Sequence, residues 1–187
     1  MKVVCGLGNP GPEYESTRHN VGWWVVEEVQ ATFGFPPFRR AGRTRVSEGR
    51  IDGHDVVLVE PLTWMNRSGA ALAPLARAEN FDVSRDLLVV VDDVALDIGR
   101  VRIRPSGSAG GHNGLKSVEA SLRTQEYARL RVGVGAGPPG ADLADWVLTP
   151  FGEEDEQRVV ELLPYLVDAV RAWVNEGAET AAGRFNR

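Results

Sequence analysis

Two short apolar runs constrain the fold of this chain more than any other feature of its sequence. Residues 3–7 and 87–91 are almost entirely hydrophobic, and the polar residues Asn9 and Asp92 follow them closely. Apolar runs of this length are typical of strands covered on both faces, as in a largely parallel sheet. Ligands bind such sheets at the carboxyl ends of the strands. Because His19 also follows the first run within a short loop, the sequence predicts a functional site at this sheet edge.

Helices and strands alternate along the chain. Apolar residues recur at helical spacing from Val21 up to Gly34, over 113–122 and over 159–173, and strands are expected over 100–104 and 130–134. The turn dipeptide Asp52-Gly53 between two strand-like stretches, 44–51 and 55–59, predicts a hairpin. This order predicts an α/β fold: a single three-layer α/β/α domain over residues 1–187, with a twisted, mixed and largely parallel central sheet.

Two prolines fall inside predicted helices. An alanine-rich helix is expected over residues 68–79, where Pro74 implies a kink or a late start. Pro164 lies within the last long helix and predicts a bend or a break there. Both expectations follow from the missing backbone N–H of proline, which removes one intrahelical hydrogen bond.

Length and composition exclude several classes of protein. With 187 residues, of which 43% are hydrophobic, the chain can bury a sizeable core. No apolar stretch approaches the roughly 20 residues that cross a bilayer, and the chain starts with a strand rather than a signal peptide, so a cytoplasmic location is expected. Cys5 is the only cysteine, which excludes an internal disulfide and a thiolate zinc site.

The charged residues are unevenly distributed. The formal net charge of −5 argues against a protein that coats nucleic acid indiscriminately. However, residues 100–131 carry seven basic and two acidic side chains, whereas residues 151–176 carry seven acidic and two basic ones. This split could direct a polyanion to one face. Solvated faces of a strand pair and of a helix explain the same pattern without a ligand.

His19 is the strongest candidate for a general base. An imidazole is partly neutral at physiological pH and can take a proton from water. Asp92 would accept a hydrogen bond from the other ring nitrogen and so fix the tautomer. No serine lies in a Gly-x-Ser-x-Gly elbow, so water is the expected attacking group. A single histidine in a loop is more often an ordinary hydrogen-bonded residue.

Three asparagines, Asn9, Asn66 and Asn113, fall at junctions between predicted elements. Their amides suit recognition of a peptide-like group, although asparagine is also an ordinary turn and capping residue. The glycine-rich segment 106–114 matches neither common phosphate-loop pattern, and we expect it to act as a lid. The three histidines lack metal-ligand spacing, so neither a metal nor a cofactor is expected.

Five segments together resemble the bacterial peptidyl-tRNA hydrolase family. They are GLGNPG at 6–11 with Tyr14, TRHNVG at 17–22, MNRSG at 65–69, GGHNGLKS at 110–117 and RLRVGVG at 129–135. Their order and spacing match across nearly the whole chain. The resemblance implies a monomeric, metal-independent enzyme that binds peptidyl-tRNA and hydrolyses the ester between the peptide and the 3′ end of the tRNA, which recycles tRNA from aborted translation.

The resemblance also implies roles for individual residues. His19 would activate water with Asp92 as its partner, and Asn9 and Asn113 would place the peptide and the water. The cleft for the peptide and the terminal adenosine would be lined by Tyr14, Trp64, Met65 and Asn66, with His112 in a mobile gate. Arg104 and Arg131 would bind the 5′ phosphate of the acceptor stem, with Arg102 and Lys116 contributing nearby charge.

The chain departs from the family pattern after the catalytic aspartate, where Val94 and Ala95 follow Asp93. Counting back seven residues from Gly99 selects Asp92 rather than Asp93 as the partner of the histidine. A catalytically inactive RNA-binding relative on the same scaffold is the main alternative function, and the presence of the four catalytic positions speaks against it. A general α/β esterase would need a nucleophile that the sequence does not offer.

Overall fold

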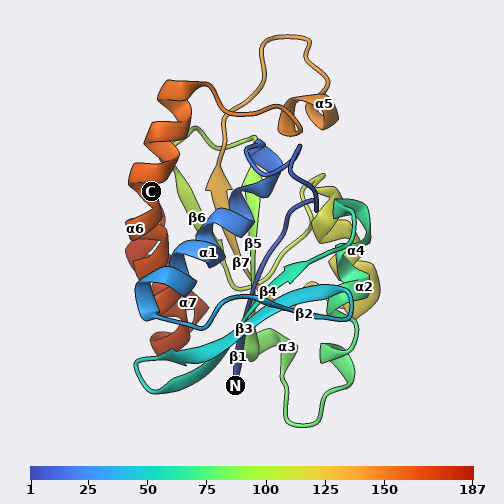
Figure 1. Cartoon of the computed structure of the whole chain (residues 1–187), viewed down its shortest axis with the longest axis vertical. Helices are drawn as coiled ribbons and strands as arrows, with labels where there is room; N and C mark the ends of the chain where they lie inside the picture. Colours follow the sequence, from blue (N-terminus) through green and yellow to red (C-terminus); the bar gives the residue numbers. More distant parts are fainter.

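The computed structural model describes all 187 residues and contains a seven-stranded sheet in the order β2-β3-β4-β1-β5-β7-β6 (Figure 1). The four central strands are parallel to one another, and the outer pairs are antiparallel, so the predicted mixed sheet with a parallel centre is confirmed. The short strand β2 was not predicted. The strands are β1 (Lys2–Gly6), β2 (Arg39–Ala41), β3 (Thr44–Ile51), β4 (His54–Pro61), β5 (Leu87–Asp93), β6 (Val101–Arg104) and β7 (Ala128–Gly133).

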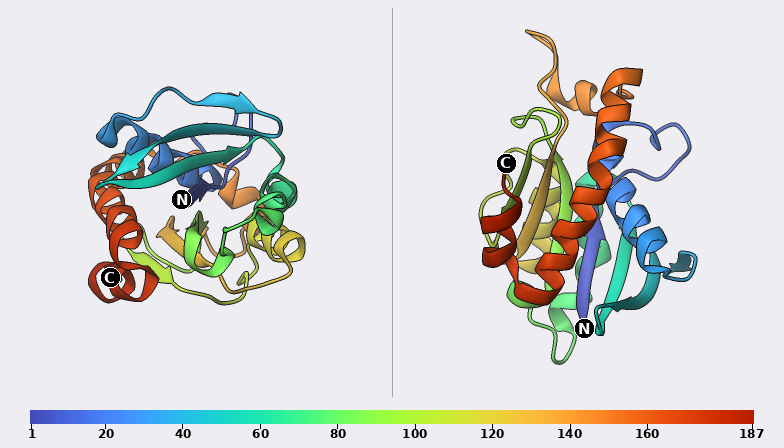
Figure 2. Two further views of the ribbon diagram at one scale, coloured as in Figure 1. Left: turned by 90° about the horizontal axis from the view of Figure 1, so that it is seen from below. Right: turned by 90° about the vertical axis from the view of Figure 1, so that its left-hand side faces the viewer.

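Helices cover both faces of the sheet, which confirms the three-layer arrangement. Helices α1 and α6 pack on one face, and α2 and α4 lie on the other (Figures 1 and 2). The α-helices are α1 (Val21–Phe33), α2 (Ser68–Leu72), α3 (Val83–Asp86), α4 (Asn113–Leu122), α5 (Leu143–Val147), α6 (Glu153–Glu176) and α7 (Ala178–Phe185), and the 3-10 helices are η1 (Arg18–Asn20), η2 (Met65–Arg67) and η3 (Leu75–Arg77). None of these helices is both long enough and apolar enough to span a membrane.

The apolar run of β5 is explained by this double cover. Leu88 and Val90 belong to the core on the α1 and α6 side, whereas Val89 and Val91 belong to the core on the α2 and α4 side. Both sets of side chains are buried, so the strand shows no polar alternation. The edge strand β6 behaves differently, because its valine and isoleucine are buried while its two arginines are exposed, as its alternating sequence predicts.

The predicted hairpin is present. β3 and β4 pair from Ile51 and His54 outward, and the turn residues Asp52 and Gly53 have φ angles of 48° and 88°. Positive φ at both positions is the requirement of the two-residue turn that Asp-Gly favours. The local sequence therefore determines this turn.

The segment around Pro74 is interrupted, as a proline predicts, whereas the break expected at Pro164 is absent. Helix α2 ends at Leu72, and a separate 3-10 turn follows Pro74, so the expectation of one helix over 68–79 is wrong. Helix α6, in contrast, runs through Pro164 without a break. Pro164 and Val160, the residue whose carbonyl loses its partner, are both exposed, so water can satisfy this carbonyl, and ten buried side chains hold the helix in place.

Candidate active site

The carboxyl ends of the central strands open into a cleft of about 590 Å³. Its walls come from the loop after β1, η1, η2, the end of β5, the glycine-rich segment before α4, and α5. Ten of the thirteen predicted site residues line it: Asn9, Tyr14, His19, Trp64, Met65, Asn66, Asp92, His112, Asn113 and Arg131. The other three, Arg102, Arg104 and Lys116, are exposed outside the cleft.

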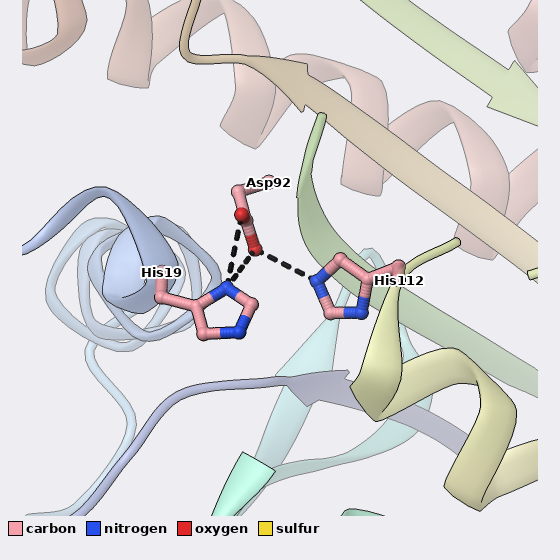
Figure 3. Close-up of side chains that lie close together, drawn as sticks. All are labelled: His19, Asp92 and His112. Carbon is pink, nitrogen blue, oxygen red and sulfur yellow. Dashed lines mark hydrogen bonds and ion pairs between the residues drawn. The ribbon is translucent and has the colours of Figure 1, made fainter. Parts of the chain in front are cut away.

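His19 and Asp92 form a buried hydrogen-bonded pair. Nδ1 of His19 lies 2.8 Å and 2.9 Å from the two carboxylate oxygens of Asp92. The side chain of Asp92 is only 2% exposed and that of His19 only 10%. Because an ionised carboxylate can only accept, Nδ1 carries the proton and Nε2 keeps its lone pair. Nε2 points away from Asp92 and is free to take a proton (Figure 3).

Asp92, and not Asp93, contacts His19, because neighbouring residues of a strand point to opposite faces of the sheet. Asp92 shares its face with Val90 and the start of α1, where η1 places the histidine. Asp93 lies on the other face and pairs with Arg131 at 3.4 Å. The choice of Asp92 made from the sequence agrees with this contact.

A second histidine contacts the same carboxylate. Nε2 of His112 lies 2.8 Å from Oδ1 of Asp92, so the carboxylate sits between the two imidazole rings (Figure 3). Nδ1 of His112 accepts hydrogen bonds from the backbone N–H groups of Gly114 and Leu115 at 3.1 Å and 3.3 Å, and so caps α4. These partners assign the proton of the neutral ring to Nε2.

The two rings determine the charge state of Asp92. Burial alone would raise the pKa of the Asp92 carboxyl. Attraction to His112 and His19, together with the hydrogen bonds from both rings, outweighs burial and holds this pKa well below its usual range. Asp92 is therefore ionised at neutral pH and can stabilise positive charge on His19.

His19, Asp92 and His112 also present ligand atoms within 4.8 Å of one another, close enough for a metal ion to bridge them. A metal on Nε2 of His112 would move the proton of the neutral ring to Nδ1, where it would face the N–H groups that this atom now accepts. The cap of α4 therefore conflicts with metal binding at His112. The three residues suit a hydrogen-bonded triad better than a metal centre.

The amide of Asn9 is held so that only its NH₂ group is free. Its Oδ1 accepts from the backbone N–H of Met65 at 2.7 Å. Its backbone N–H and C=O both pair with the side chain of Asn20, at 2.9 Å and 3.0 Å. Nδ2 of Asn9 is thus available as a donor in the cleft. Asn66 and Asn113 line the same cleft and are exposed.

Apolar side chains line the cleft together with these polar groups. Tyr14 and Trp64 pack edge to face with ring centroids 5.7 Å apart, and 51% of Trp64 is exposed. Leu143, Val147 and Leu148, from α5 and the residue after it, also line the cleft and were not predicted from the sequence. The sequence does contain a signal that predicts helix α5, because Asp142 is a preferred N-cap residue and apolar residues follow it at helical spacing.

Arg18 and Asn20, on either side of His19, were not predicted to have roles. Nη1 of Arg18 donates to the carbonyls of Thr149 and Pro150, and its guanidinium lies 3.6 Å from the centre of the Trp146 ring. Arg18 thereby ties the segment after α5 to the turn that carries the histidine. Only tertiary contacts reveal this connection.

The predicted phosphate-binding residues divide into two groups. Arg102, Arg104 and Lys116 are exposed and form no ion pair within the protein. Arg131, in contrast, pairs with Asp93 and donates to the carbonyl of Ser108 at 3.0 Å. Its guanidinium is therefore partly occupied by the protein itself.

The chain is similar over almost its whole length to proteins of one family. A family model described as peptidyl-tRNA hydrolase matches residues 3–187. The peptidyl-tRNA hydrolase of Gemmatimonas aurantiaca is 43% identical over 190 residues, covering 100% of both chains. That of Symbiobacterium thermophilum is 44% identical over 187 residues, covering 99% of this chain and 98% of the relative. The crystal structure of peptidyl-tRNA hydrolase from Acinetobacter baumannii matches with a TM-score of 0.91 at 29% identity, covering 100% of this chain and 94% of that one.

Proposed function

Because the chain belongs to the peptidyl-tRNA hydrolase family, we propose that its cleft hydrolyses the ester between a peptide and the 3′ end of tRNA. The buried His19–Asp92 pair carries this proposal, since it leaves one basic nitrogen free in the cleft. The one thiol is unsuited to act as a nucleophile, because Cys5 lies inside β1 and burial raises its pKa. Water is therefore the attacking group.

In the proposed reaction, Nε2 of His19 takes a proton from a water molecule as the water oxygen attacks the ester carbonyl carbon. The Asp92 carboxylate stabilises the imidazolium that forms. When the tetrahedral intermediate collapses, the bond to the 3′ oxygen of the tRNA breaks, and this oxygen takes the proton back from Nε2. The peptide gains a hydroxyl and the tRNA gains a hydrogen, so one water is consumed.

The amides place the peptide. We assign the free Nδ2 of Asn9 to a carbonyl oxygen of the substrate, because its Oδ1 is already bound to Met65. Asn113 stands at the start of α4, beside His112, and would hold the attacking water. Asn66 and the Tyr14–Trp64 pair would contact the peptide and the terminal base.

The tRNA would lie across the exposed basic side chains of β6 and α4. Arg102 and Arg104 share the face of the sheet on which α4 lies, because they pair with Arg131 and Arg129 of β7. The acidic helix α6 covers the opposite face. A polyanion is therefore attracted to one side of the protein. We include in this proposal a monomeric state and a cytoplasmic location, which size-exclusion chromatography and cell fractionation test.

Replacing the base tests the function. His19→Ala should lower the rate of peptide release from an N-acylated aminoacyl-tRNA about 10²- to 10⁴-fold, the usual contribution of a general base, while the substrate still binds. His54→Ala is the matched control, because His54 is exposed at the hairpin and does not line the cleft. The wild-type protein should spare aminoacyl-tRNA with a free amino group. Full activity of His19→Ala would refute the assignment, and tRNA binding by a wild-type chain without hydrolysis would indicate the inactive RNA-binding alternative.

A further inference from the structure

We propose that His112 is a positioning residue that joins the start of α4 to the Asp92 carboxylate. It thereby holds Asn113 in a fixed position relative to His19. This inference rests on the proposed function, because it concerns the alignment of the same base and the same amide. It assigns His112 a fixed place in the site rather than a place in a mobile gate.

The two nitrogens of His112 perform different tasks. Nδ1 accepts from the N–H groups of Gly114 and Leu115, which are otherwise unpaired at the start of α4. Nε2 donates to Oδ1 of Asp92 at 2.8 Å. The side chain is only 7% exposed, so both contacts are shielded from water.

Histidine is an unusual choice for a helix cap. Serine, threonine, aspartate and asparagine are preferred, because a short side-chain oxygen accepts from the first turn. None of these short side chains extends far enough to replace Nε2 at Asp92. The second contact therefore explains why a histidine occupies this position.

The cap also determines where Asn113 lies. Asn113 is the first residue of α4 and directly follows His112. The chain before it has no regular structure and is held by the bond from the His112 backbone N–H to the carbonyl of Ala109, at 3.1 Å. The contact with Asp92 anchors this segment to the end of β5. The positions of the Asn113 backbone and of the His19 ring therefore both depend on the Asp92 carboxylate.

The contact has an electrostatic consequence as well. Oδ1 of Asp92 accepts from both His19 and His112, each at 2.8 Å. The neighbouring charges are directed elsewhere, because Arg131 pairs with Asp93 and Arg18 binds the carbonyls of 149 and 150. Without the donor from His112, Asp92 would stabilise the His19 imidazolium more strongly.

Two substitutions separate the tasks of the two nitrogens. Oδ1 of an asparagine occupies the place of Nδ1, so His112→Asn keeps the cap and loses the contact with Asp92. Nε2 of a glutamine occupies the place of the other nitrogen, so His112→Gln keeps a donor near Asp92 and loses the cap. The experiment measures kcat, KM, the pH profile of kcat/KM and Tm for both variants and the wild-type protein.

His112→Asn should keep a KM within about twofold of the wild-type value, while kcat falls about tenfold because Asn113 and His19 are no longer aligned by one carboxylate. Its Tm should fall by a few degrees, because the buried Asp92 carboxylate loses one hydrogen-bond donor. The acid limb of its kcat/KM profile should move to higher pH. His112→Gln should keep the wild-type pH profile and lower Tm by a few degrees.

Wild-type kcat and pH profile in His112→Asn would overturn the proposal. Activity that falls only in proportion to Tm in both variants would also overturn it, since this would indicate a purely structural cap. Either result leaves the proposed function intact as long as the wild-type protein hydrolyses peptidyl-tRNA and His19→Ala does not.

Discussion

Gly22→Ala tests whether the position of His19 depends on how closely α1 approaches the sheet. Gly22 lies in the first turn of α1, three residues after the histidine. A Cβ at this position would lie 2.5 Å from the carbonyl oxygen of Val90 and 2.7 Å from the backbone N and O of Leu7. These are main-chain atoms of β5 and of the segment after β1, so no side-chain rotation relieves the clash.

The structure sets the size of the effect. Ordinary contact begins near 3.4 Å, so the shortest of these distances is 0.9 Å too small, the difference between 3.4 and 2.5. Overpacking of this kind costs about 1–3 kcal/mol, which corresponds to a fall in Tm of about 2–12 °C in a chain of this size. The retreat of α1 would carry His19 away from Asp92, and a misplacement of about 1 Å lowers a catalysed rate about 100-fold.

Single-turnover hydrolysis and thermal unfolding measure both effects. We expect the rate constant of Gly22→Ala to fall about 10- to 100-fold. Gly183→Ala is the matched control, because a Cβ at this position in α7 has no neighbour within 4 Å. It should keep the wild-type rate and gain up to about 1 kcal/mol from helix propensity. A wild-type rate and Tm in Gly22→Ala would refute the argument that this close approach positions the base.

Two further predictions concern other charged residues. Burial raises the pKa of Glu60 to about 7, against the attraction of Arg45. The folded protein therefore holds this proton more tightly than the unfolded chain, whose glutamates titrate near 4.3, and stability should fall by about 2 kcal/mol as pH rises from 5 to 8. Glu60→Gln should lack this fall in urea unfolding, and an identical pH dependence in both chains would contradict the prediction. Arg104→Ala should raise KM and reduce the slope of log affinity against log salt by about 1, because Arg104 has no ion-pair partner in the protein; an unchanged slope would remove Arg104 from the tRNA surface.

Local sequence patterns predicted most of the fold. The apolar runs that became β1 and β5, the Asp52-Gly53 turn and the helix at 113–122 all depend on residues close together in the chain. The two prolines show where such patterns fail. Pro74 ends a five-residue helix with three buried residues, whereas Pro164 is tolerated in a helix that buries ten. A helix continues past proline only when its packing outweighs the cost of about 3 kcal/mol, and this packing is tertiary.

In the candidate site, too, some features were predictable from local sequence and others depend on tertiary contacts. The motifs named His19, Asp92 and the three asparagines, because these residue types follow strands or begin helices. The contact between His112 and Asp92 joins α4 to β5, and Arg18 joins η1 to the segment after α5. Neither contact is visible in any short stretch of the chain, and Arg131 carries no sequence signal that its charge is shared with Asp93.

The amino-acid sequence by itself determined which chemistry is available here: a base, a carboxylate and several amides, each placed next to an element of known type by local periodicity and turn preferences. Tertiary structure alone decided which partners these groups bind. The reason is geometric: hydrogen bonds such as that between His19 and Asp92 join atoms within 3 Å whose residues lie 73 positions apart in the chain. The faces that the helices cover, and therefore the physical reason why Asp92 and not Asp93 contacts His19, emerge only when the sheet and its two layers pack together.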